Sequence, residues 1–168
     1  MSFPEKFEVL IITLSDRAFR GEYDDLSGPK VREKVEEFFN ASGWPFSVKM
    51  TLIPDDSRML KELLVNPENN FNVIITTGGT GIGPRDITVE TVIPLLNKEI
   101  PGIMEYIRIK YGSEKPNALL SRGVAGIIGQ TLIYTLPGSV RAVEEYMAEI
   151  VKTFRHTINM LYGIDKHN

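Results

Sequence analysis

The segment NVIITTGGTGIGPRD, residues 72–86, joins a predicted strand to a predicted helix through a glycine-rich loop. Its first six residues form a β-branched run, which is typical of a strand buried on both faces of a parallel sheet. Four of the 14 glycines then fall within residues 78–83, between this strand and a segment with helical spacing. Alternation of strand and helix predicts an α/β fold, in which ligands bind at the carboxyl ends of the strands.

The segments on either side repeat the alternation of strands and helices. The run EVLIIT, residues 8–13, predicts a second buried strand, and the alternating residues 46–53 suit a strand at the edge of the sheet. Two apolar runs, at 123–128 and 131–136, flank a Gly-Gln pair and resemble a hairpin or two closely spaced strands. Helical spacing predicts helices at residues 29–40, 57–65, 89–96, 102–111 and 140–161. Pro94 is expected to kink or end the third of these helices.

This order of elements predicts an α/β three-layer sandwich with a mostly parallel central sheet. The reason is that each crossover between parallel strands places a helix on one face of the sheet. The 168 residues contain no internal repeat, no low-complexity run and no linker that would divide them. We therefore expect a single domain over residues 1–168, which is close to the usual domain size.

The composition excludes several kinds of chemistry. The chain has 22 acidic and 19 basic residues, a net charge of −3 and a pI near 5.5, so a nucleic-acid partner is not expected. The absence of cysteine excludes disulfides and thiolate chemistry, and the presence of only two histidines, His156 and His167, argues against a histidine metal site. No signal peptide or membrane span is recognisable, which predicts a cytoplasmic protein. Its chemistry must rest on carboxylates, hydroxyls, backbone amides and Lys or Arg.

The glycine-rich loop is the strongest candidate for a binding site. Such a loop can turn its backbone N–H groups towards an anion, although a tight turn without a ligand is the alternative. It matches neither the dinucleotide-binding spacing, because Pro84 replaces the third glycine, nor a P-loop, because the Gly-Lys-Ser/Thr ending is missing. Asp86 would repel a bare phosphate beside the loop. A Mg²⁺ ion between them would reverse that repulsion, since carboxylate and phosphate oxygens are its preferred ligands.

Three further junctions between strands and helices carry polar residues. Ser15 and Asp16 open a long loop after the first strand, which is either functional or a solvated connection. Asp55 and Asp56 follow the edge strand. Asp56, or Ser57 beside it, is expected to cap the next helix, which leaves Asp55 without a structural role.

The last junction holds Gly138 and Ser139, which can present amides to an anion, or form an ordinary turn. Upstream, Ser121 and Arg122 could add a hydroxyl and a fixed cation. Two anion-type junctions on one sheet suggest a ligand with several phosphates, or two anionic ligands side by side.

Seven short blocks occur in the order and spacing of one protein family: TLSDR (13–17), DLSGP (25–29), IPDD (53–56), TGGTG (77–81) with PRD (84–86), PG (101–102), LSR (120–122) and LPG (136–138). On these blocks, from about residue 8 to 150, the chain resembles the molybdenum-cofactor biosynthesis proteins of the Mog/MoaB type. The resemblance implies a single α/β domain that assembles as a homotrimer. It also implies molybdopterin adenylyltransfer, in which ATP and molybdopterin give adenylylated molybdopterin and pyrophosphate with Mg²⁺. Contact with the molybdate-insertion enzyme is a further implied partnership.

The resemblance also implies roles for individual residues. Asp86 is the expected metal ligand, Asp55 orients or helps to bind the metal, and Ser121 holds the pterin or its phosphate near the reacting centre. The resemblance assigns the nucleotide to the residues Ser15, Asp16, Gly78, Gly79, Thr80 and Gly81. Glu105 and Arg122 are expected to line the pterin pocket.

Two other functions compete with the transferase. One is a non-catalytic protein that binds molybdopterin and hands it to partners, although a mere carrier has less need of a metal-ready carboxylate. The other, which ignores the resemblance, is a generic nucleotide-dependent phosphotransferase, and the missing P-loop lysine weighs against it. The same fold also serves as a domain of molybdate-insertion proteins, but the short chain argues against that larger enzyme.

Overall fold

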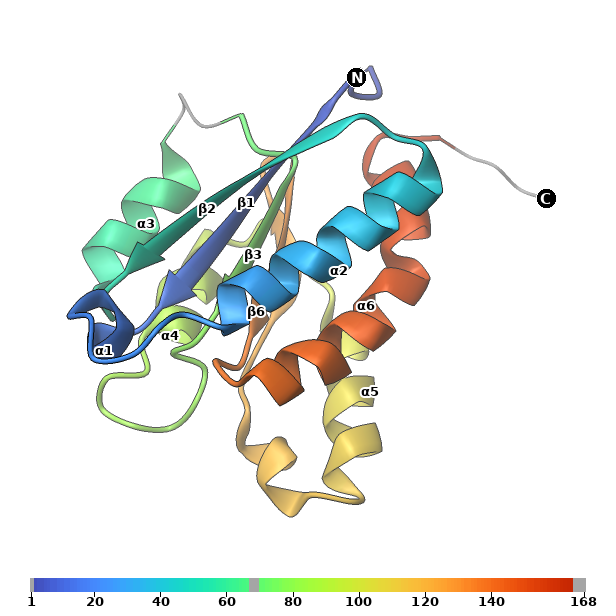
Figure 1. The fold of residues 1–168 in the computed structure, drawn as a ribbon. Helices are drawn as coiled ribbons and strands as arrows, with labels where there is room; N and C mark the ends of the chain where they lie inside the picture. Colours follow the sequence, from blue (N-terminus) through green and yellow to red (C-terminus); the bar gives the residue numbers. More distant parts are fainter. Residues whose placement is uncertain (1, 67–69, 165–168) are drawn as a thin grey trace.

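A computed structural model describes residues 2–66 and 70–164 of the chain (Figure 1). The predicted domain of residues 1–168 extends beyond these ranges, and His167 lies outside them. The described residues form one six-stranded sheet with the strand order β2-β1-β3-β6-β5-β4. Its strands are β1 (Phe7–Leu14), β2 (Phe46–Ile53), β3 (Val73–Thr77), β4 (Lys98–Glu99), β5 (Ala125–Ile128) and β6 (Thr131–Leu136).

The pairing of the strands confirms a mostly parallel sheet. β2, β1, β3 and β6 run parallel to one another, whereas β5 pairs antiparallel with both β6 and β4. β2 is an edge strand, as its alternating pattern predicts. β5 and β6 form a tight hairpin, and its Gly129 takes a positive φ of 60° that favours glycine.

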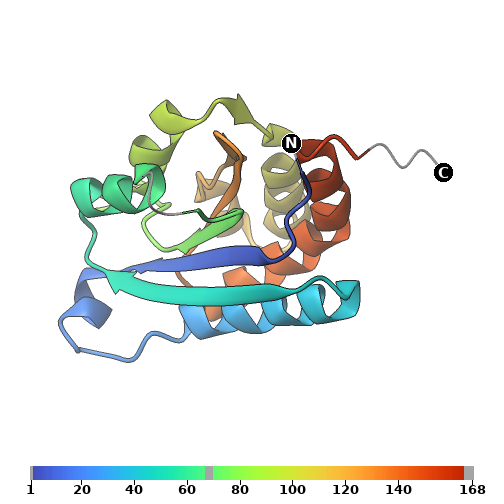
Figure 2. The same cartoon turned by 90° about the horizontal axis from the view of Figure 1, so that it is seen from above.

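Helices cover both faces of the sheet and give the predicted three layers (Figure 2). The helices are α1 (Asp16–Phe19), α2 (Ser27–Ser42), α3 (Ser57–Val65), α4 (Thr88–Val92), α5 (Pro101–Gly112) and α6 (Val140–Leu161), with 3-10 turns η1 (Ile93–Leu95) and η2 (Pro116–Leu120). α2, α5 and α6 pack on one face in a core that contains Val9 and Ile11 of β1. α3 and α4 pack on the other face over Leu10 and Ile12. Successive residues of β1 therefore enter opposite cores, which explains the unbroken apolar run.

Local capping chemistry explains where the best-defined helices begin. Asp56 is the N-cap of α3, and its carboxylate accepts hydrogen bonds from the amides of Arg58 and Met59. Ser139 caps α6 in the same way through the amide of Ala142. The helix predicted at 89–96 is interrupted at the expected proline: α4 ends at Val92 and the chain tightens into η1, because Pro94 cannot continue the α-helical bonding.

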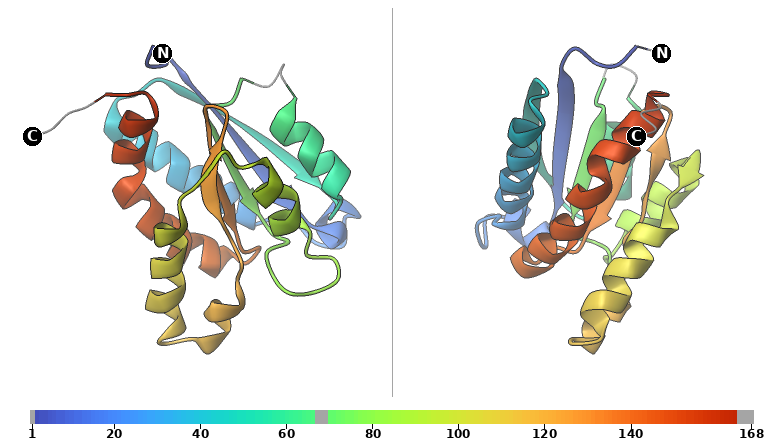
Figure 3. Two further views of the ribbon diagram at one scale, coloured as in Figure 1. Left: turned by 180° about the vertical axis from the view of Figure 1, so that it is seen from behind. Right: turned by 90° about the vertical axis from the view of Figure 1, so that its right-hand side faces the viewer.

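The sequence patterns did not predict the shortest elements. α1, β4 and η2 have between two and five residues, too few for a period to be recognised. α5 and η2 extend together past the edge of the sheet where the parallel strands end (Figure 3). Among the described residues, no helix is long and apolar enough to cross a membrane.

Candidate functional site

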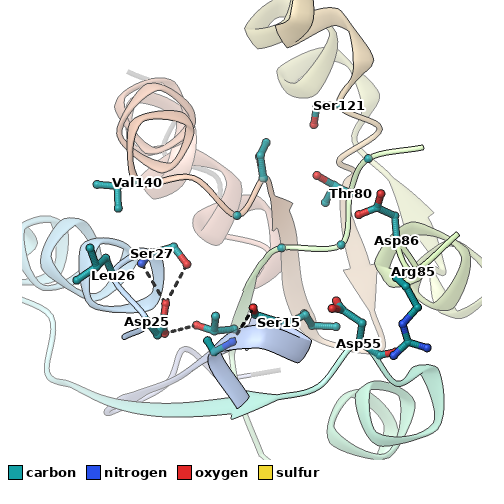
Figure 4. Close-up of a pocket in the computed structure, with 18 of the residues that line it drawn as sticks. Ser15, Asp25, Leu26, Ser27, Asp55, Thr80, Arg85, Asp86, Ser121 and Val140 are labelled. Atoms are coloured by element: carbon teal, nitrogen blue, oxygen red, sulfur yellow. Dashed lines mark hydrogen bonds between the residues drawn. The ribbon is translucent and has the colours of Figure 1, made fainter. Parts of the chain in front are cut away.

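A pocket of about 700 Å³ lies at the carboxyl ends of β1, β3 and β6 (Figure 4). This is the edge of an open α/β sheet where ligands bind, and the connections that follow the paired strands β1 and β3 lead to strands on opposite sides of them. The volume lies within the usual range of small-molecule pockets. Nine of the residues singled out in the sequence line it: Ser15, Asp55, Gly78, Gly79, Thr80, Gly81, Asp86, Ser121 and Gly138.

The glycine loop follows β3 and forms one wall of the pocket. Gly78 has a φ of +100°, and a Cβ atom there would overlap the carbonyl oxygen of Leu14. Gly79 has a φ of +65°, and its Cβ would lie 2.5 Å from Oγ1 of Thr88. Both positions therefore require glycine for conformation and for space.

Hydrogen bonds from Thr88 and Arg122, which do not line the pocket, hold the carbonyl groups of this loop in place. Thr88 donates from Oγ1 to the carbonyl of Gly78 at 2.9 Å and from its amide to the carbonyl of Gly79 at 3.0 Å. Arg122 donates through Nε and Nη2 to the carbonyl of Gly81, at 2.8 and 2.6 Å. Among the described residues, the amides of Gly79, Thr80 and Gly81 have no hydrogen-bond partner. The loop can therefore offer these N–H groups to an anion.

Two carboxylates reach the pocket from different strand ends. Asp55 follows β2, and its Oδ2 accepts a hydrogen bond from the amide of Asp16 at 3.0 Å. Asp86 lies in the loop before α4, and its Oδ2 accepts from the amide of Gly83 at 2.7 Å. In the described part of the chain, the second oxygen of each carboxylate has no hydrogen-bond partner. Each aspartate is thus held by one oxygen and keeps the other for a ligand.

The electrostatics of Asp55 follow from its position. Burial raises the pKa of the Asp55 carboxyl, the hydrogen bond from Asp16 opposes the rise, and the negative charges of Asp16 and Asp86 add to it. A cation next to Asp55 would relieve this unfavourable environment. The described residues contain no cluster of three or more acidic or histidine side chains that could hold a metal alone. Asp55 and Asp86 therefore suit an ion that takes its remaining ligands from phosphate and water, as Mg²⁺ does.

A third carboxylate at the pocket has a structural role that the sequence did not disclose. Asp25 accepts hydrogen bonds from the hydroxyl of Thr13 at 2.6 Å and, through Oδ1, from the amides of Ser27 and Gly28 at 3.0 Å. It thereby caps the start of α2 and fastens this helix to the end of β1. An aspartate two residues before Ser27, at the start of a predicted helix, could have indicated that Asp25 binds the first amides of that helix. Within a long loop, however, nothing distinguished Asp25 from the other polar residues.

Other unpredicted residues complete the wall. Tyr23 lines the pocket and shares a hydrogen bond of 2.8 Å with the hydroxyl of Ser15. Leu26, Ile82 and Leu120 line it while remaining more than half exposed. Apolar side chains beside an amide cradle suit a ligand that combines a flat ring with phosphates.

Four residues singled out in the sequence do not line this pocket. Ser139 is occupied as the N-cap of α6, and Glu105 lies on the exposed side of α5. Arg122 lines an adjacent hollow, holds the glycine loop and forms an ion pair with Glu90. Asp16 pairs with Arg85, and the hydrogen bond from Arg85 holds the pKa of Asp16 below its ordinary value. The roles of these four residues as ligands stay predictions.

The fold and the pocket together define an open α/β protein with a candidate ligand site at the carboxyl ends of β1 and β3, where the connections lead to opposite sides of the sheet. The chain belongs to the molybdenum-cofactor biosynthesis family, because a domain described as a probable molybdopterin binding domain matches residues 10–156. A molybdopterin adenylyltransferase from Pyrococcus furiosus is 38% identical over 156 residues, which cover 89% of this chain and 88% of the relative.

A solved structure extends the similarity to three dimensions. The molybdopterin biosynthesis enzyme MoaB from Thermus thermophilus has a TM-score of 0.80 and 38% identity, covering 94% of this chain and 97% of that chain. The molybdenum cofactor synthesis protein cinnamon from Drosophila melanogaster is 35% identical over 153 residues, or 90% of this chain. The chain spans 25% of the length of cinnamon, so the family domain also occurs within much longer proteins.

Proposed function

We propose that this protein transfers AMP from ATP to the terminal phosphate of molybdopterin. In this reaction a phosphate oxygen of molybdopterin forms a bond to the α-phosphorus of ATP. The bond between the α-phosphorus and the bridging oxygen breaks, and its electron pair leaves with pyrophosphate. One observation carries the proposal: the glycine loop, the paired carboxylates and the Ser121 hydroxyl meet in one pocket of about 700 Å³.

The side chains of the pocket suit such a transfer. Both reactants are anions, so the protein must align them and offset their charge, which needs no histidine or cysteine nucleophile. The free amides of Gly79, Thr80 and Gly81 can receive phosphate oxygens. Ser121 lies across the pocket from β1 and can donate its hydroxyl to the pterin or its phosphate. The relative from Pyrococcus furiosus is a molybdopterin adenylyltransferase, which supports the proposal of the same reaction for this chain.

Asp86, with help from Asp55, would hold a Mg²⁺ ion in this proposal. When bound, the ion supplies positive charge that offsets the charge of the phosphates. The free oxygens of the two carboxylates fit this role, since Mg²⁺ commonly takes one or two carboxylates together with substrate phosphates. The protein itself holds Oδ2 of Asp55 and Oδ2 of Asp86 with backbone amides. The other oxygen of each carboxylate has no partner among the described residues and faces the pocket.

The direct test is an assay of pyrophosphate release and adenylylated pterin with purified molybdopterin, ATP and Mg²⁺. Asp86→Asn should reduce the rate about 100- to 1,000-fold, which is the usual loss when one electrostatic contact at a reacting centre is removed. Asp55→Asn should also reduce it strongly. Asp56→Asn is a matched control, because asparagine caps a helix as well as aspartate does and Asp56 does not line the pocket. It should keep the wild-type rate.

The same assay separates the transferase from a carrier. A carrier would bind molybdopterin tightly in a calorimetric titration and release no pyrophosphate, and that result would reject the proposed reaction. Failure to bind molybdopterin, with retained hydrolysis or transfer from ATP, would instead support a generic phosphotransferase.

We also propose that the protein is a homotrimer. α5 and η2 pack against each other and carry four large apolar side chains that are at least half exposed: Tyr106, Ile109, Leu119 and Leu120. A contact between copies would cover them. Light scattering should give three times the 18.9 kDa chain mass, and Ile109→Asp should lower it. A mass of one chain would reject this assembly.

The proposed reaction also suggests where the protein acts and which protein receives its product. Use of ATP favours a reaction in the cytoplasm. The adenylylated pterin would pass to a molybdate-insertion enzyme, and co-purification with that enzyme is the test of direct contact.

A further inference from the structure

Asp16 and Arg85 form a two-point ion pair across the carboxyl ends of the sheet. Arg85 donates from Nε to Oδ2 of Asp16 at 2.9 Å and from Nη2 to Oδ1 at 3.0 Å. The same Nη2 donates to the backbone carbonyl of Asp55 at 3.0 Å. One guanidinium in the loop after β3 therefore bridges the residues that follow β1 and β2, although Arg85 and Asp16 are 69 residues apart in the sequence.

Asp16 and Asp55 also bind each other reciprocally. The amide of Asp16 donates to Oδ2 of Asp55 at 3.0 Å, and the amide of Asp55 donates to Oδ1 of Asp16 at 3.1 Å. Asp55 is consequently held at its amide, its carbonyl and one carboxylate oxygen. Both oxygens of Asp16 are already occupied, and its negative charge would repel a phosphate.

Arg85 lines the pocket, whereas Asp16 does not. We infer that both are positioning residues that hold Asp55 at the pocket through the ion pair, and that neither binds the nucleotide. We call this pair the Asp16–Arg85 clasp. The inference rests on the proposed transferase for its kinetic test and assigns Asp16 a different role from the nucleotide contact that the family resemblance implies. Its physical basis is that planar two-point contacts of arginine fix geometry as well as charge.

The charges explain why a clasp is needed. Asp16, Asp55 and Asp86 are close enough for Asp16 and Asp86 to disfavour the charged form of Asp55. Arg85 is the cation that opposes this repulsion while it binds the backbone. We therefore expect that the loss of Arg85 frees the carbonyl of Asp55 and leaves only the two hydrogen bonds with Asp16 to hold Asp55 near the reacting centre.

The first test compares the effect of each substitution on kcat with its effect on KM for ATP. Arg85→Ala and Asp16→Asn should each lower kcat for adenylyl transfer about 10- to 100-fold, because a displacement of about 1 Å at a reacting centre costs that much. KM for ATP and ATP binding by calorimetry should change less than about twofold, since no nucleotide contact is lost. The double variant should be no slower than either single variant, because the two side chains act through one pair.

Two variants keep this test specific. Arg20→Ala is the matched control, because the charge of Arg20 also acts on Asp16, but its side chain pairs with Glu22 and makes neither of the two hydrogen bonds of the clasp. It should leave kcat unchanged. Arg85→Lys should not restore the rate, since lysine returns the charge but not the two-point contact. If Arg85→Ala weakens ATP binding about tenfold at constant kcat, or lysine restores the rate, Arg85 is a phosphate ligand and the inference is wrong.

A readout without catalysis tests the clasp even if the transferase proposal fails. In ¹⁵N–¹H spectra of the whole protein, the amide of Asp55 should shift in Arg85→Ala and Asp16→Asn and stay in place in Arg20→Ala. Thermal unfolding of each variant confirms that it remains folded. An unmoved Asp55 amide in both folded clasp variants would overturn the inference, whatever the activity of the wild type.

Discussion

Gly79 is required in the glycine loop for two reasons, its positive φ and the lack of space for a Cβ atom, and replacement by alanine tests both. Gly79 has a φ of +65°, and its Cβ would lie 2.5 Å from Oγ1 of Thr88 and 3.5 Å from Oδ1 of Asp55. Gly43 offers a matched control, because its φ is +68° and an added Cβ would meet no atom of the described residues within 4 Å. It caps the end of α2, away from the lining of the pocket.

The expected magnitudes follow from these contacts. A left-handed alanine costs about 1–2 kcal/mol, and Gly43→Ala should show only this loss. In Gly79→Ala, Thr88 must also move, and its hydroxyl bond to the buried carbonyl of Gly78 would be broken at a further cost of about 1–3 kcal/mol. Gly79→Ala should therefore lose about 2–5 kcal/mol in total.

Urea unfolding followed by circular dichroism measures both values, since the free energy of unfolding falls linearly with denaturant. Calorimetric titration with ATP and Mg²⁺ adds the functional consequence: Gly79→Ala should bind more weakly, and Gly43→Ala should bind like the wild type. Equal losses of stability in the two variants would show that Thr88 does not constrain the loop. That result would refute the argument that side-chain contacts behind the loop fix its shape.

Two more predictions concern groups outside the pocket. Arg122→Ala should lower the free energy of unfolding by about 1 kcal/mol, a value reduced for its partly exposed side chain, because the carbonyl of Gly81 loses its donors. A loss of pterin binding without any loss of stability would instead make Arg122 a direct ligand. The Lys110 and Lys152 ammonium groups hold the pKa of the buried Glu149 carboxyl below its ordinary value. Its contribution to stability is therefore complete above the unfolded pKa of about 4.3 and is lost as the pH falls further. Glu149→Gln should flatten the acid side of a stability–pH curve, and an unchanged curve would contradict the ion pairs.

The sequence predicts the parts of this fold that depend on local patterns. α6 begins and ends where its helical spacing indicates, and α3 begins directly after the aspartate expected to cap it. β2 is recognisable as an edge strand because alternation reports one buried face. η1 shows the limit of such patterns. Pro94 correctly predicts that the helix is interrupted although the apolar spacing continues through residues 93–95, but the form of the interruption, a tighter 3-10 turn, is seen only in the structure.

The site depends more on contacts between distant segments, which no spacing reveals. Asp16 has the appearance of a free carboxylate after a strand, yet Arg85 binds it from another loop. Asp25 has the appearance of a loop residue, yet it joins Thr13 to the start of α2. Glu105 entered the prediction through family resemblance alone, and the structure leaves it on an exposed helix surface. In each case the missing information is the identity of the partner, which the fold supplies.

These partners sort the carboxylates around the pocket into two kinds. Asp16 forms an ion pair with a guanidinium, and Asp25 accepts hydrogen bonds from the Thr13 hydroxyl and from the amides at the start of α2. Asp55 and Asp86 each accept one hydrogen bond from a backbone amide, and within residues 2–66 and 70–164 neither carboxylate forms an ion pair. If the pocket receives two anions, as we propose, two uncompensated carboxylates there are unfavourable unless a cation enters with the ligands. The hydrogen-bond pattern therefore supports the proposal that Mg²⁺ binds at Asp55 and Asp86, and it gives Asp16 and Asp25 other roles.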